Sequence, residues 1–248
     1  MTVWRLEWLR LTRTRRLAVL VGVFAFLGLT GPLTARYLGE ILKTLGTGGI
    51  QVTFPPPRPA DGIAEYSSNI GQIGLLVVVL IAASALAFDG RREMAVFLRT
   101  RLAVREIVLP AYAMNVLAAT VGCLVGSGAA WYETAVLLGP LPAGRMLLGV
   151  LCSVVFLAFA VALTALTAAW TRSTVAAAGS ALAAMLAMAI AGSVPAIARF
   201  LPTSLAGAMA QLVDGTSPRE FLPALAIAIA AAAVCVGGAV AIGSRHEV

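Results

Sequence analysis

The residue types that carry most enzyme chemistry are scarce in this sequence. The only histidine is His246, close to the C-terminus, which excludes an HExxH zinc site and a catalytic triad that uses histidine. No GxxxxGK[ST] phosphate loop and no GxSxG elbow occur, so the chain has no recognisable ATP site of its own. We therefore expect no catalytic residue, no metal site and no cofactor, and we do not expect an enzyme.

Other reactive or polar residues lie inside apolar runs. Cys123, Cys152 and Cys235 show no metal-ligand spacing, so we interpret them as small buried residues and expect no disulfide. No Asp or Glu lies deep in a run, which disfavours a carboxylate proton relay.

Three polar side chains interrupt otherwise apolar helices. Asn115, Thr164 and Thr167 lie within the third and fourth runs. Such groups commonly bond a neighbouring helix or their own preceding carbonyl. The alternative is that they line a substrate path, and both interpretations stay open.

The segment 89–106 reads DGRREMAVFLRTRLAVRE. As a short helix it would present Met94, Phe97 and Leu98 on one face, surrounded by Arg91, Arg92, Arg99 and Arg101. A small apolar patch ringed by charge is typical of a surface that docks into a protein groove. The alternative is a loop that packs on lipid.

The first sixteen residues read MTVWRLEWLRLTRTRR. At helical spacing Trp4, Trp8 and Leu11 share one face, and the arginines spread over the rest. This pattern predicts a helix in the membrane interface, with indoles at headgroup level and arginines toward anionic lipid. It would act as a topology anchor or as a lever that joins a cytoplasmic partner to the first span.

The elements that must position these residues are six charge-free runs, since a helix needs roughly 20 apolar residues to cross a bilayer. The runs are Leu17–Ala35, Tyr66–Phe88, Ile107–Tyr132, Met146–Thr171, Ser173–Ala198 and Phe221–Ser244. Backbone groups in lipid must bond internally, so each run predicts a helix. The expected fold is an all-α, polytopic membrane protein, with residues 1–248 forming a single transmembrane domain.

Composition and charge agree with this fold and orient it. The chain is 60% hydrophobic and only 12% charged, with a mean hydropathy of +0.95, where a soluble domain is about a quarter charged. The basic residues flank the runs and form no stripe, so we expect no nucleic-acid binding. With the N-terminus inside, twelve basic residues lie on the inner side and six on the outer side, so both termini are predicted to be cytoplasmic.

The connections differ in length and character. Residues 36–65 are expected to form a long outer loop, with Pro55, Pro56, Pro57 and Pro59 excluding helix. The outer segment 195–220 is broken by Pro195 and Pro202, and it could dip into the membrane or form an ordinary loop. Gly122 and Gly126 form a GxxxG pair, which favours packing within the chain over dimerisation.

This layout resembles the permease subunit of a type-2 ABC exporter. The likeness covers nearly the whole chain, and its best local match is the inner loop. Arg92-Glu93 match the family's acidic-basic cluster, Phe97-Leu98 its apolar turn, Thr100 its threonine and Val104-Arg105 its ending. Met94-Ala95 replace the usual Gly-Thr, and Leu102 replaces the usual proline.

The resemblance implies that residues 89–106 form a coupling helix. Its docking residues toward an ATPase subunit would be Arg92, Glu93, Met94, Phe97, Leu98 and Arg101. Two ATPase subunits and a second permease chain, identical or homologous, would complete an exporter in the bacterial cytoplasmic membrane. Because few charges are buried, we expect an amphipathic or lipophilic cargo, such as a drug or a lipid. The alternatives are a membrane anchor or assembly factor without transport, and an intramembrane enzyme.

Overall fold

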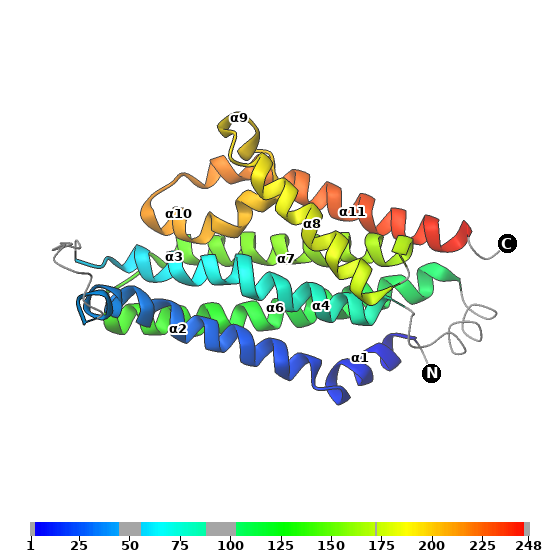
Figure 1. Cartoon of the computed structure of the whole chain (residues 1–248), viewed down its shortest axis with the longest axis horizontal. Helices are drawn as coiled ribbons and strands as arrows, with labels where there is room; N and C mark the ends of the chain where they lie inside the picture. Colours follow the sequence, from blue (N-terminus) through cyan, green and yellow to red (C-terminus); the bar gives the residue numbers. More distant parts are fainter. Residues whose placement is uncertain (1–2, 45–55, 88–102, 172, 246–248) are drawn as a thin grey trace.

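The computed structural model describes residues 3–44, 56–87, 103–171 and 173–245, and these residues form a bundle of helices with no strand among them (Figure 1). The elements in chain order are α1 (Val3–Arg13), α2 (Arg16–Thr44), α3 (Pro59–Asn69), the π-helix η1 (Ile70–Gly74), α4 (Leu75–Leu86), α6 (Val104–Leu137), α7 (Ala143–Thr171), α8 (Thr174–Ala191), α9 (Pro195–Ala198), the 3₁₀-helix η2 (Pro202–Gly207), α10 (Ala208–Asp214), the 3₁₀-helix η3 (Pro218–Phe221) and α11 (Leu222–Arg245).

Six helical stretches in the described ranges are long and apolar enough to cross a membrane, which confirms the six predicted spans. They are Arg16–Leu38, Pro59–Leu86, Val104–Leu137, Ala143–Thr171, Thr174–Ala191 and Pro218–Ser244. Each stretch has the length and hydropathy that match the hydrocarbon core of a bilayer, so the chain is a multi-pass membrane protein.

The loop expected at residues 36–65 is shorter than predicted. Helix α2 continues to Thr44, and α3 already begins at Pro59. Proline at the first position of a helix is tolerated because its missing N–H would have no partner there. Pro59 therefore starts a helix, and the expectation that it excludes helix was wrong.

The α2, α3 and α6 helices meet closely at the GxxxG pair. A Cβ atom on Gly126 would lie 2.5 Å from both the Phe24 carbonyl oxygen and the Tyr66 hydroxyl. Tyr66 is fully buried, and its hydroxyl lies 3.3 Å from Ser127 Oγ. A Cβ atom on Gly122 would lie 3.3 Å from Cδ2 of the Phe24 ring. The pair packs helices of one chain together, as predicted.

The helix ends separate into two groups along the bundle. At one end lie the start of α1, the end of α4, the start of α6, the α7–α8 connection and the end of α11 (Figure 1). These are the segments predicted to be cytoplasmic. The end of α2, the start of α3 and the α6–α7 connection lie at the opposite end.

The fifth span is shorter than the predicted Ser173–Ala198, because α8 ends at Ala191. Helix α8 packs against α7 and α4, whereas α10 packs against α7 and α3. Since α3 and α4 are successive parts of the second span, α8 and α10 together cover its length. Between 195 and 220, α9 is exposed and projects from the bundle (Figure 1), whereas η2 and α10 are folded onto it, with Leu205, Met209 and Leu212 buried.

Candidate functional site

The predicted docking residues lie in a segment outside the described residues. Arg92, Glu93, Met94, Phe97, Leu98 and Arg101 all belong to 88–102. The flanks of that segment are described: α4 ends at Leu86 and α6 begins at Val104. Both flanks emerge at the end of the bundle where α1 lies (Figure 1).

Helix α1 packs against α6 and α2, and its least exposed residues are both apolar and charged. Leu11 is buried, and Glu7 pairs with Arg10 at 3.2 Å, with side chains only 12% and 13% exposed. Trp4 and Trp8 are about half exposed. Trp4, Trp8 and Leu11 lie within ~60° of one another around α1, so they share one helix face as predicted, with Leu11 at its packed edge. The position of this face in the membrane interface stays a prediction. Glu7 and Arg10 join Leu11 on the packed side because their charges neutralise each other there.

A sharp turn separates α1 from the first span. Arg15 has φ of 57° and is the only described non-glycine residue with positive φ. This left-handed conformation is uncommon for a residue with a Cβ atom. It lets α1 leave the axis of α2, which Figure 1 shows as a bend between the two helices.

The three polar residues of the spans are buried, and their donors bond to backbone carbonyls. Asn115 Nδ2 donates to Ala111 O at 2.7 Å, and Thr164 Oγ1 donates to Ala160 O at 2.8 Å. Thr167 Oγ1 lies 3.1 Å from Thr164 O and 3.0 Å from Ala177 O. These are the bonds that the first of the two interpretations expects, and a role in a substrate path stays a prediction.

The bond from Thr167 crosses from α7 to α8 and secures the tight connection between them. Helix α8 then begins with Ser173 as its N-cap, whose Oγ accepts from the Ala176 N–H. A serine at this position satisfies a helix N–H that would otherwise lack a partner. The Thr171 hydroxyl also donates to Ser173 O at 3.4 Å, so the hydroxyl groups of Thr167, Thr171 and Ser173 all bond where α7 ends and α8 begins.

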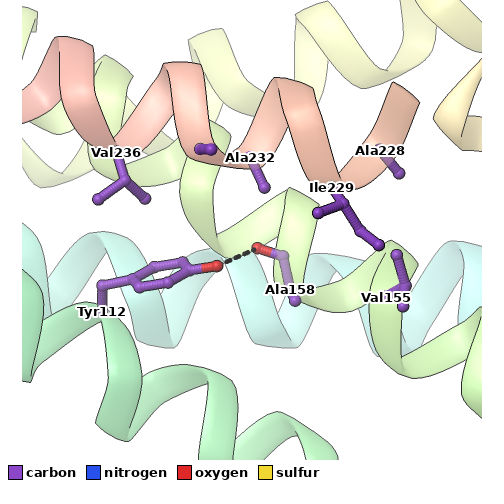
Figure 2. Close-up of a pocket in the computed structure, with 8 residues that line it drawn as sticks. Tyr112, Val155, Ala158, Ala228, Ile229, Ala232 and Val236 are labelled. Atoms are coloured by element: carbon purple, nitrogen blue, oxygen red, sulfur yellow. Dashed lines mark hydrogen bonds between the residues drawn. The ribbon is translucent and has the colours of Figure 1, made fainter. Parts of the chain in front are cut away.

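A groove lies between α6, α7 and α11 (Figure 2). Its volume is about 470 Å³. Eight residues line it: Tyr112, Val155, Ala158, Ala228, Ile229, Ala232, Ala233 and Val236. The Tyr112 hydroxyl points toward Ala158 O at 3.5 Å, and the side chains of the other seven lining residues consist of carbon alone. A space of this kind accepts an apolar occupant.

Sequence analysis did not find this groove. Its signal is weak: a tyrosine in an apolar run and alanines at positions 228 and 232 of the last span. Positions i and i+4 share a helix face, and alanines there leave room beside a neighbouring helix. The same alanines could equally have supported close packing, so the pattern alone could not separate a contact from a groove.

The opposite end of the bundle carries a small ionic connection. Arg58, the residue before α3, lies 3.6 Å from Asp61 and 3.4 Å from Asp214 at the end of α10. Ser67 Oγ donates to Ala206 O at 2.6 Å, and a Cβ on Gly149 would lie 2.6 Å from the Met209 Cα. These contacts attach the segment before the last span to α3 and α7. The ion pairs are exposed and add little stability.

Cysteines and acidic residues form no metal-binding group of three or more in the described part of the chain. Cys123, Cys152 and Cys235 are buried and unpaired, as the sequence predicted. No protein-family model matches this sequence, and no curated protein matches it significantly.

Proposed function

We propose that this chain is the transmembrane subunit of an ATP-driven exporter of the type-2 ABC class. It would work in the bacterial cytoplasmic membrane with two separate ATPase subunits and a second permease chain, identical or homologous. The cargo would be amphipathic or lipophilic. The six spans support a role within the membrane, and the missing phosphate loop agrees with ATP hydrolysis by a separate chain.

One observation carries the proposal: α1, the flanks of residues 88–102 and the α7–α8 connection lie at the same end of the bundle. A soluble partner that binds the loop would therefore also be close to α1. Because α1 packs against both α6 and α2, a displacement there is transmitted to the first and third spans.

The mechanism would use these contacts to couple ATP binding to rearrangement. Closure of the two ATPase subunits on ATP would move residues 89–106, and the last three of these residues already belong to α6, the third span, which begins at Val104. The buried Leu11 and the contacts of α1 with α6 and α2 would hold α1 to the bundle during that movement. The two permease chains would then alternate between inward-facing and outward-facing states.

The exposed sides of α8 and α11 leave room for the second permease and for lipid. Val175, Leu186 and Ile190 on α8 are each more than 60% exposed. Apolar residues on the outside of a membrane bundle face lipid or another span. A role as a membrane anchor or assembly factor would also use such surfaces, but it would not require an ATPase at residues 89–106.

Purification from native membranes tests the proposal. A tagged chain, isolated in mild detergent after chemical cross-linking, should bring ATPase subunits with it, and the complex should hydrolyse ATP. The chain expressed and purified alone should hydrolyse none. Recovery without any ATPase, or hydrolysis by the chain alone, would overturn the assignment. Recovery with a non-ATPase partner instead would favour the anchor.

A further inference from the structure

The groove between α6, α7 and α11 lies on the outside of the bundle and is partly open. Ala228 at its base is buried, whereas Ile229 beside it is 59% exposed. The residues from Ala228 to Val236 extend over ~12 Å of helix. The groove has a volume of about 470 Å³ along that length.

A basic residue lies on the same face of α6 as the groove. Arg105 precedes Tyr112 by seven residues, so the two differ by only ~20° around the helix and by ~10 Å along it. Arg105 is exposed, and Leu109, between them on this face, is 43% exposed. The exposed side chain of Leu109 therefore lies between Arg105 and the groove on this face of α6.

Arg105 has no charged partner among the described residues. The guanidinium makes no ion pair or hydrogen bond with the rest of the described chain. Glu106 is also exposed, but it lies ~100° away around the helix. Helices α6 and α11 touch beside Arg105, where a Cβ on Gly243 would lie 2.7 Å from Val104 Cγ1, and this contact closes the bundle below the groove.

We propose that the groove binds one acyl chain of an anionic phospholipid whose headgroup is held by Arg105. The lining offers carbon atoms to the chain, and the arginine offers a positive charge at the end of the bundle where headgroups lie. A methylene chain gains little from leaving lipid for an apolar groove. The arginine therefore selects the lipid, and the shape of the groove orders its chain.

Photolabelling of the purified chain in detergent tests this site. The probes are phosphatidylglycerol and phosphatidylcholine, each with a diazirine in one acyl chain. Phosphatidylglycerol should label peptides of α6 and α11 that contain Tyr112 and Ala228–Val236. Ala232→Phe fills the groove and should abolish that labelling. Val234→Phe, on the same helix at a residue 74% exposed and outside the groove, should retain it.

A charge variant separates the headgroup from the chain. Arg105→Gln should lower labelling by phosphatidylglycerol about fivefold, the effect of one arginine near anionic lipid, to the level of phosphatidylcholine. Arg145→Gln, exposed at the opposite end of the bundle, should leave it unchanged.

Two results would overturn the site. One is equal labelling of wild type by the two lipids, and the other is unchanged labelling of Ala232→Phe. The wild-type comparison does not depend on any variant folding correctly. These measurements need no ATPase, so they can succeed even if the proposed transport function is wrong.

Discussion

Gly126 lies where three helices touch, and its missing side chain sets their separation. The Phe24 carbonyl, Gly28 and the Tyr66 hydroxyl all approach it. The GxxxG spacing indicated close packing but could not name the partners. Those depend on which helices become neighbours, and a single spacing carries no such information.

Replacing Gly126 with a residue that has a side chain should destabilise the bundle. Gly126→Val places carbon atoms into the Phe24 backbone, and overpacking of this kind costs about 2 kcal/mol or more. The apparent Tm in detergent should fall by ~5 °C. Gly128→Val is the matched control, because nothing lies within 4 Å of a Cβ at Gly128 and both changes introduce the same residue into one helix. Equal Tm values for the two variants would contradict this packing.

At the scale of elements, hydropathy located all six spans, since the cost of burying charge in lipid is large and local. Hydropathy did not locate the ends of the helices, because a helix can continue or stop outside the lipid without burying a charge. Helix α2 extends to Thr44 beyond the apolar run, and α8 ends at Ala191 although the run continues.

The burial of two charged residues on α1 was not predicted, for a different reason. Hydrophobic periodicity placed Trp4 and Trp8 with Leu11, as the helix has them, but tertiary contacts also bury Glu7 and Arg10 beside Leu11. A neutral pair of charges can be packed against a bundle edge, and no hydrophobic pattern records that. The groove at Tyr112 was missed because it depends on the spacing between α6 and α11, which both pack against α7.

For the whole molecule, the charge distribution predicts an orientation that a reporter can test. A reporter fused after Val248 should read as cytoplasmic, and one inserted next to Arg58 should read as external. The reason is the excess of basic residues on the predicted inner side, twelve against six. An external C-terminus would contradict the orientation and place residues 89–106 out of reach of any cytoplasmic ATPase.

The central claim is that residues 89–106 bind an ATPase, and Phe97→Asp tests it most directly. If Phe97 fills a groove on the ATPase, its loss removes about 2 kcal/mol or more at a hot spot, and the carboxylate adds a desolvation cost. Phe200→Asp is the control, since Phe200 is 41% exposed in the segment between α8 and α11.

The measurement is pull-down of the ATPase subunit at matched membrane levels of wild type, Phe97→Asp and Phe200→Asp. Binding should weaken by more than about tenfold for Phe97→Asp, because each 1.4 kcal/mol is one decade, and Phe200→Asp should bind as wild type does. Equal recovery by all three proteins would contradict the assignment of residues 89–106 to ATPase docking.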